Sequence, residues 1–166
     1  MNYTTVRASI KSGDLIAQSH RAPFWRSFFD FKIAVVRALT QSEFSHVGVA
    51  WVIAERVFIL EAVSAGVRIF PLSRAGDFYH LPLPALWGTD AEAYALSHVG
   101  DSYSQIEAIQ AYFGPVDELG DVWECAQYAL CVLEQAGIQL GTVATPTAVV
   151  RAAQLLGAPC SLITNP

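Results

Sequence analysis

Three neighbouring stretches of the chain consist mostly of apolar and β-branched residues, as is typical of β-strands: residues 45–53, 57–63 and 67–72. Two short segments, Ala54-Glu55-Arg56 and Ser64-Ala65-Gly66, separate them. Because both connections are so short, the pattern predicts an antiparallel meander. The run Leu15-Ile16-Ala17, which follows the turn Ser12-Gly13-Asp14, predicts a further short strand near the N-terminus.

Other segments have the periodicity or the end signals of helices: residues 24–39, 89–99, 104–113, 123–136 and 145–157. Thr145 and Pro146 suit the N-cap and first position of the last of these helices, and Gly137 is placed to end the one before it. Pro82 and Pro84 favour a loop over residues 77–87. The helix over residues 123–136 is mostly apolar, so we expect it at the centre of the fold.

These elements predict a single α+β domain over residues 1–166, in which an antiparallel sheet packs against a central helix that carries a cysteine. A chain of 166 residues that is 53% hydrophobic is long and apolar enough to bury one sizeable core. The same apolar content is also compatible with a surface that is buried against a protein partner.

Charge and hydropathy narrow the classes of partner. The formal net charge is −5, and the sequence has no cluster of Lys and Arg, which argues against binding to nucleic acid. No uninterrupted apolar run reaches the length of about 18 residues that spans a bilayer, so we expect a soluble protein. Residues 1–10 lack the apolar region of a signal peptide, which predicts a cytoplasmic protein at synthesis.

The three cysteines, Cys125, Cys131 and Cys160, are an odd number without regular spacing. They do not form a disulfide framework, and the absence of a Cys-x-x-Cys pair gives no sign of a zinc site. We therefore expect reduced thiols and no cofactor. Cys131 falls inside a predicted helix, where cysteine usually acts as a small buried apolar residue, and Cys160 lies near the end of the chain.

Candidate chemistry is carried by an ordered trio of residues. His46 begins the first strand of the meander, Glu61 lies in the second strand, and Cys125 begins the central helix. Strand alternation predicts His46 and Glu61 on one face of the sheet, opposite or diagonal to each other. A helix N-terminus and an imidazolium both favour a thiolate, so the trio predicts a thiol nucleophile, a base and a carboxylate that orients the base.

Each of the three residues also has a structural interpretation. A cysteine in an apolar helix is most often a buried structural thiol, a lone histidine is often a satisfied core residue, and Glu61 could lie at a strand edge and face water. A glutamate within the apolar run 57–63 nevertheless needs a partner if it is buried. His46 is the partner we expect.

The other histidines are weaker candidates. Ser97-His98-Val99-Gly100 repeats the tetrapeptide around His46, but it falls at the end of a predicted helix, where His98 is expected to act as a C-terminal cap. His20 and His80 fall in predicted loops and are expected to be solvated.

Several motifs in this order resemble the circularly permuted branch of the NlpC/p60 papain-like cysteine peptidases, the YiiX-like group. They are Gly13-Asp14-Leu15-Ile16, Phe44-Ser45-His46-Val47-Gly48-Val49, Leu60-Glu61-Ala62, Gly100-Asp101-Ser102-Tyr103, Trp123-Glu124-Cys125-Ala126 and Thr145-Pro146. In the permuted branch the strand with the histidine precedes the helix with the cysteine, as it does here.

The resemblance implies a role for each motif residue. Cys125 would be the nucleophile, His46 the general base and then acid, and Glu61 the group that orients the imidazole. Tyr103 matches the tyrosine of the family's Gly-x-x-Tyr stretch, which would line the site or assist the oxyanion. The implied reaction is hydrolysis of amide bonds, with peptides of the bacterial cell wall as the substrate class.

Two alternatives remain open at this point. One is a lipid acyltransferase or thioesterase of the lecithin:retinol acyltransferase type, which shares the order of His before Cys but typically has a second histidine and an Asn-Cys-Glu-His-Phe stretch. The other is a non-catalytic component of a phage tail or secretion apparatus on the same fold. A phage virion protein, a delivered effector and a cytosolic peptidase all agree with the expected lack of an export signal.

Overall fold

The computed structural model describes residues 1–19, 43–103, 122, 123 and 125–165. Two of the predicted helices, at residues 24–39 and 104–113, lie outside the described residues. The loop position expected for His20 lies outside them as well.

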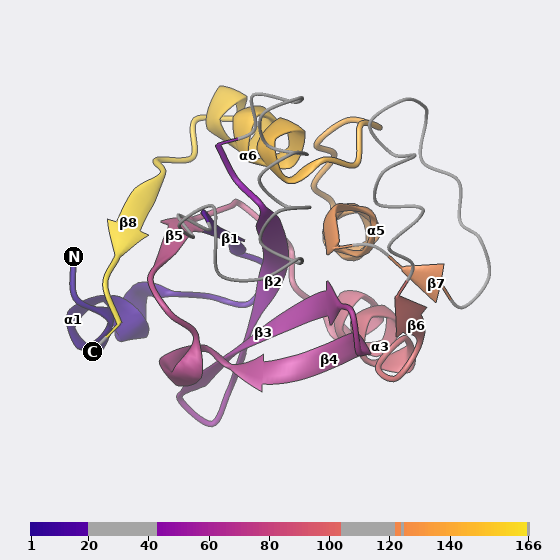
Figure 1. Ribbon diagram of the computed structural model, residues 1–166, viewed down its shortest axis with the longest axis horizontal. Helices are drawn as coiled ribbons and strands as arrows, with labels where there is room; N and C mark the ends of the chain where they lie inside the picture. The colour runs from indigo at the N-terminus through magenta and orange to yellow at the C-terminus, as the bar shows by residue number, and fades with distance from the viewer. Residues whose placement is uncertain (20–42, 104–121, 124, 166) are drawn as a thin grey trace, which may run out of the picture.

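Six strands form one antiparallel sheet in the order β4-β3-β2-β1-β5-β8 (Figure 1). Their bounds are β1 (Leu15–Gln18), β2 (His46–Ile53), β3 (Arg56–Val63), β4 (Gly66–Pro71), β5 (Phe78–Leu81) and β8 (Ser161–Ile163). The predicted strand at Leu15-Ile16-Ala17 and the predicted meander are confirmed as β1 and as β2 to β4. Ala54 and Glu55 connect β2 to β3 with φ values of 46° and 62°, the left-handed conformation that a tight hairpin needs.

The helices of the described residues are α1 (Tyr3–Val6), α3 (Thr89–Ser97), α5 (Cys125–Gln135) and α6 (Pro146–Leu155), with 3₁₀ turns η1 (Arg7–Ser9) and η2 (Leu72–Arg74). The last helix begins as predicted, with the Thr145 side chain accepting a hydrogen bond from the Ala148 N–H at 3.2 Å. Gly137 follows the end of α5 with a φ of 76°, as its predicted role as a stop requires.

The central helix begins two residues later than predicted, at Cys125. Trp123 instead lies in the short strand β7 (Val122–Trp123), which pairs in parallel with β6 (Ser102–Tyr103). The predicted helix over residues 89–99 is α3, which begins at Thr89 as predicted and ends at Ser97, two residues earlier than predicted.

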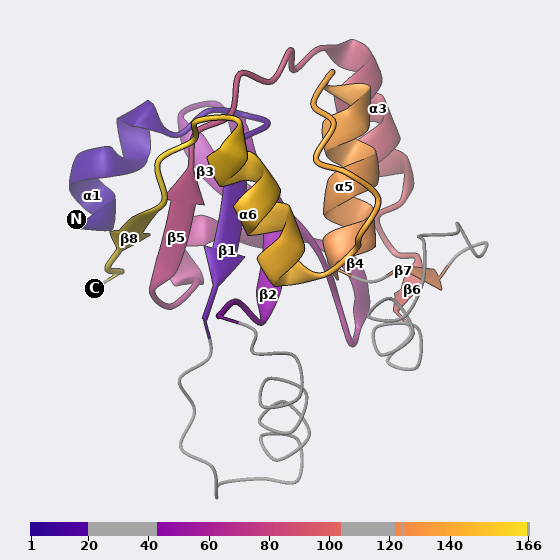
Figure 2. The same cartoon turned by 90° about the horizontal axis from the view of Figure 1, so that it is seen from above.

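Alternating residues of the sheet divide the core into two clusters. On one face, Val47 and Val49 of β2 pack with apolar residues of α5 and α6. On the other face, Ala50 of β2 packs with Ile59 of β3 and with Tyr3 of α1. Figure 2 shows α6 lying across β1, with α5 and α3 side by side next to it. Of the helices in the described part of the chain, none combines the length and apolar character needed to cross a bilayer.

The prediction of a loop over residues 77–87 is wrong for its first part, because Phe78–Leu81 forms strand β5 between β1 and β8. Pro82 and Pro84 follow this strand, so they end it and do not prevent it from forming. The expectation that His80 is solvated is also wrong. His80 is buried in β5, and its Nε2 lies 2.7 Å from Oδ2 of the buried Asp14.

Asp14 holds three segments together at the start of β1. Its carboxylate also accepts hydrogen bonds from the backbone N–H groups of Lys11, at 2.8 Å, and Leu83, at 3.1 Å. A buried carboxylate with this many donors is a satisfied structural group. The Gly-Asp motif therefore fixes the turn before β1 to the loop after β5.

Candidate active site

Cys125 lies at the first turn of α5 and is only 7% exposed. The helix is held in place by apolar contacts with β2 and β3, and by Tyr128, whose hydroxyl donates a 2.8 Å hydrogen bond to the Ala95 carbonyl of α3. Tyr128 is fully buried, and burial raises the pKa of its hydroxyl. These contacts give the thiol a fixed position at the N-terminal end of a rigid helix.

His46 and Glu61 come from the neighbouring strands β2 and β3. The pairing of β2 with β3 extends as far as Val49 and Leu60. Glu61 follows Leu60 directly, and His46 lies at the start of β2. The two side chains are in contact, in agreement with the prediction that they lie near each other on the sheet. Gly48 permits the close approach of the strands, because a Cβ atom there would lie 2.7 Å from the Leu60 carbonyl oxygen.

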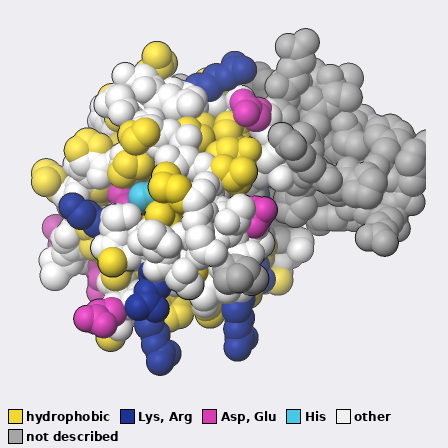
Figure 3. Space-filling view, turned by 90° about the vertical axis from the view of Figure 1, so that its left-hand side faces the viewer, with side chains coloured by type: hydrophobic (Ala, Val, Ile, Leu, Met, Phe, Trp, Pro, Cys, Tyr) yellow, Lys and Arg dark blue, Asp and Glu magenta, His cyan; other side chains and the backbone are white. Residues whose placement is uncertain are grey.

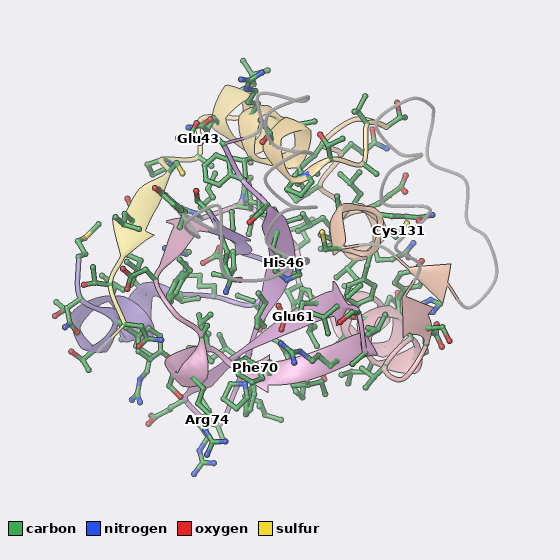
Figure 4. All side chains as sticks on the ribbon, in the orientation of Figure 1. Glu43, His46, Glu61, Phe70, Arg74 and Cys131 are labelled. Carbon is green, nitrogen blue, oxygen red and sulfur yellow. The ribbon has the colours of Figure 1, made fainter. Side chains whose placement is uncertain are left out.

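The structure brings the three predicted residues together around the imidazole ring. His46 Nε2 lies 2.6 Å from Glu61 Oε2, and Figure 4 shows these two side chains side by side. The His46 side chain also forms a hydrogen bond with Cys125. Because Nε2 is occupied by Glu61, Nδ1 is the ring nitrogen that remains for the thiol. The side chains of His46 and Glu61 are 15% and 4% exposed, so the contact is largely shielded from water.

Arg68 is a fourth member of this group that the sequence analysis missed. It lies directly opposite Glu61 on β4, and its Nε donates a 2.8 Å hydrogen bond to Glu61 Oε1. Its guanidinium also stacks on the Phe70 ring, 4.6 Å from the ring centroid. Both oxygens of the Glu61 carboxylate therefore have a partner, one on each neighbouring strand.

These contacts set the charges of the group. Burial alone would lower the pKa of His46, but its hydrogen bonds to Cys125 and Glu61, and the charges of those groups, raise it to about 10. Burial alone would raise the pKa of Glu61, but His46 and Arg68 bring it below its usual value. At neutral pH the structure thus has an imidazolium between a carboxylate and the Cys125 sulfur.

Tyr103, the fourth residue that the resemblance suggests, lies in β6, with its backbone paired to Trp123 of β7. This pairing places it next to the segment that leads into Cys125. The position of its side chain lies outside what the structure describes.

The other thiols and histidines lie apart from the group. Cys131 is half-buried in the body of α5, and burial together with the Glu43 carboxylate raises the pKa of Cys160 (Figure 4). His98 caps the end of α3, as predicted, and its Nδ1 lies 2.7 Å from Asp101 Oδ2. His80 is paired with Asp14.

The raised pKa of His46 predicts a pH-dependent contribution to stability. The contribution is complete below the ordinary histidine pKa of 6.5 and disappears as the pH rises towards about 10. For Glu61, whose pKa is lowered, the contribution is complete above its ordinary value of 4.5 and disappears as the pH falls. We expect the difference in unfolding free energy between the wild type and His46→Ala, measured by urea denaturation, to be largest between these two values. A difference that stays constant up to pH 10 would contradict this assignment.

The fold and the site together define the class of protein: α+β, with an antiparallel sheet whose His–Glu pair meets a cysteine at the start of a helix. No family model matches the sequence, and no curated protein shows significant similarity to it. A solved structure with a similar fold is that of the metalloprotein YiiX from Escherichia coli O157:H7, described as DUF1105, with a TM-score of 0.57 and 17% sequence identity. The similarity covers 95% of this chain and 89% of that chain. The fold is therefore YiiX-like, as the sequence motifs indicated.

Proposed function

We propose that this chain is a cysteine hydrolase of the papain-like type, with Cys125 as nucleophile, His46 as base and acid, and Glu61 as the positioning residue. The observation that carries the proposal is that one imidazole contacts both the thiol and a buried carboxylate. An isolated structural cysteine has no need of such a pair. The pair also costs desolvation energy that a core of apolar side chains would not require.

The proposed reaction is acyl transfer to water. The Cys125 thiolate attacks an amide carbonyl, and the backbone N–H at the start of α5, with Tyr103 as a further candidate, stabilises the oxyanion. His46 then donates its proton to the leaving amine, the C–N bond breaks, and a thioester to Cys125 remains. His46 next removes a proton from water, which attacks the thioester and releases the carboxylic acid and the thiol.

The family assignment is part of the proposal. The His strand precedes the Cys helix in this chain, which is the order of the permuted NlpC/p60 branch, and the YiiX-like fold is compatible with that branch. We propose one hydrolase domain over residues 1–166. We propose peptide amides of the bacterial cell wall as substrate, reached from a phage virion or by delivery as an effector.

A metal ion is not part of this proposal, although the YiiX structure is described as that of a metalloprotein. Among the described residues, no group of three or more His, Cys, Asp and Glu side chains could hold a metal ion. His46 and Arg68 already occupy both oxygens of Glu61. The described residues thus do not fit a metal centre, and the proposed reaction uses only groups of the chain itself.

Thiol alkylation tests the proposed class of enzyme without knowledge of the substrate. We expect iodoacetamide to modify Cys125 rapidly near neutral pH, and at least about tenfold more slowly in the His46→Ala variant, because that variant lacks the imidazole that contacts the thiol. Mass spectrometry of the peptides after timed quenching measures the rate at each cysteine. Cys131 and Cys160 provide internal references in the same sample. Equal rates at Cys125 in both proteins would contradict the proposal.

A matched pair of substrates tests the bond that is cleaved. We expect release of new amines from peptidoglycan fragments and no release of fatty acids from phospholipid or acyl thioester substrates. The opposite pattern would favour the lipid acyltransferase alternative, and a protein inactive on both, with an unreactive Cys125, would favour the non-catalytic one.

A further inference from the structure

A hollow lies away from the Cys-His-Glu group, where the N-terminal helix meets the ends of two strands. It has a volume of about 410 Å³ and is lined by Tyr3, Arg7, Arg56, Ser73 and Arg74, together with apolar groups that include Val57. These residues come from α1, η1, the start of β3 and η2. Figure 4 shows Arg74 at the edge of the molecule, well away from His46 and Glu61.

The charge of this hollow is opposite to that of the chain. Three of the ten Lys and Arg residues line it, and no acidic residue does, in a protein with a formal net charge of −5. Figure 3 shows Lys and Arg side chains projecting from the lower part of the face that includes α1. Positive charges that line one hollow repel one another, and an anion bound between them would reduce the repulsion.

None of these three arginines has a carboxylate partner within the described ranges of the chain, where Arg68 is the arginine that forms an ion pair. Arg68, by contrast, has two partners within the protein, the Glu61 carboxylate and the Phe70 ring. The guanidinium donors of Arg7, Arg56 and Arg74 are instead available to a ligand.

Tyr3 provides independent evidence for a polar ligand. The residue is only 5% exposed, and its ring packs edge-on against Phe78 with a centroid distance of 6.1 Å. Its hydroxyl has no hydrogen-bond partner among the residues that the structure describes, which is unusual for a buried tyrosine. Burial raises the pKa of this hydroxyl, against the opposing effect of the Arg7 charge, so it is a neutral donor at physiological pH.

The size and the donors together select a class of ligand. A hollow of about 410 Å³ is in the range of small-molecule sites and is much larger than one inorganic ion needs. Three guanidinium groups and a hydroxyl offer more donors than one carboxylate can accept, whereas the terminal oxygens of a phosphomonoester can accept from all of them. Val57 and the neighbouring apolar groups offer a surface for an organic body.

We propose that this pocket binds a phosphomonoester, with Arg7, Arg56, Arg74 and the Tyr3 hydroxyl as its phosphate ligands. The ligand is either a free organic phosphate or the headgroup of a lipid such as phosphatidic acid, because both present the same group. The site is separate from the proposed hydrolase site and does not depend on its activity.

Calorimetric titration of the purified full-length chain tests the proposal, with phenyl phosphate and inorganic phosphate as soluble probes at constant ionic strength. We expect saturable binding of phenyl phosphate, weakened at least about tenfold in the Arg56→Ala/Arg74→Ala double variant. Tyr3→Phe retains the ring and its packing, and is expected to weaken binding about tenfold. Arg151→Ala, which removes an exposed arginine of α6 outside the pocket, is the matched control and should bind like the wild type.

Co-sedimentation with vesicles distinguishes the two sources of phosphate. Binding to phosphatidylcholine vesicles that contain phosphatidic acid, lost in the double variant, would identify a lipid headgroup, and binding of the soluble ester alone would identify a free metabolite. The proposal is overturned if no probe binds saturably, or if the double variant and the wild type bind equally. The arginines are exposed, so their replacement leaves the core intact, and circular dichroism confirms the fold of each variant.

Discussion

Replacing Cys125 with alanine is expected to lower kcat/KM for amide hydrolysis at least about 10⁴-fold, since no other group of the site can form the acyl intermediate. The fold should be retained, because alanine fits the space of a small buried side chain and removes only the sulfur. Release of amines from peptidoglycan fragments, followed over time at saturating and subsaturating substrate, measures the loss in kcat and KM separately.

Cys131→Ala is the matched control for this experiment. It makes the same chemical change further along the same helix, at a half-buried position. We expect activity close to that of the wild type. Hydrolysis that persists undiminished in Cys125→Ala would refute the proposed nucleophile, and a similar loss in both variants would indicate damage to α5 instead.

The parts of the fold that could be predicted are those whose sequence pattern is local. The meander of β2, β3 and β4 follows from alternation and short connections, and α6 follows from its Thr-Pro start. The same alternation places His46 and Glu61 on one face. The contact of Cys125 with His46 was expected from the resemblance and the order of motifs, because no local pattern links a helix to a strand so far away in the chain.

The parts that were missed depend on pairing between distant segments. Strand β5 is a short run next to two prolines, and it is a strand because β1 and β8 provide partners on both sides. Strand β8 and helix α1 meet where the chain ends come together, with the N-terminal amine donating to the Leu162 carbonyl at 2.8 Å. Helix α1 has only four residues, too few for a periodic signal.

Arg68 could have been found by counting residues across the predicted turn. The hairpin at residues 64–66 pairs Val63 with Gly66. Two residues further from the turn on each strand, Glu61 lies opposite Arg68. An opposite-charge pair directly across two strands is a recognisable sequence signal. The burial of Asp14 with His80 gave no comparable signal, because it joins two segments that the sequence did not place next to each other.

Replacing Glu61 with alanine is expected to affect both stability and activity, because it leaves the His46 imidazolium without its buried carboxylate. Loss of one partner of a buried ion pair costs about 3–5 kcal/mol of unfolding free energy. Turnover should fall about 10²–10⁴-fold, because the imidazole loses the group that fixes its orientation. Urea denaturation and the hydrolysis assay measure the two effects on the same protein.

Glu61→Gln separates the charge of this residue from its shape. Glutamine retains an oxygen that can accept from His46, so the loss of stability should be smaller than in the alanine variant. Two of the influences that raise the pKa of His46 to about 10 come from Glu61, its hydrogen bond and its charge. The alkaline limb of the pH–kcat/KM profile, which follows loss of the proton from His46, should therefore move from near pH 10 to lower pH in this variant.

This shift distinguishes a positioning residue from a merely structural one. A glutamate that only held β3 to β4 through Arg68 would lower stability when replaced but would leave the alkaline limb where it is. Arg68→Ala is the matched comparison, because it removes the other partner of the same carboxylate while the contact with His46 remains. We expect Arg68→Ala to shift the limb less than Glu61→Gln does. If the alkaline limb lies at the same pH in the wild type and in Glu61→Gln, the carboxylate does not control the proton on His46. Glu61 would then have no part in the proposed Cys-His-Glu mechanism.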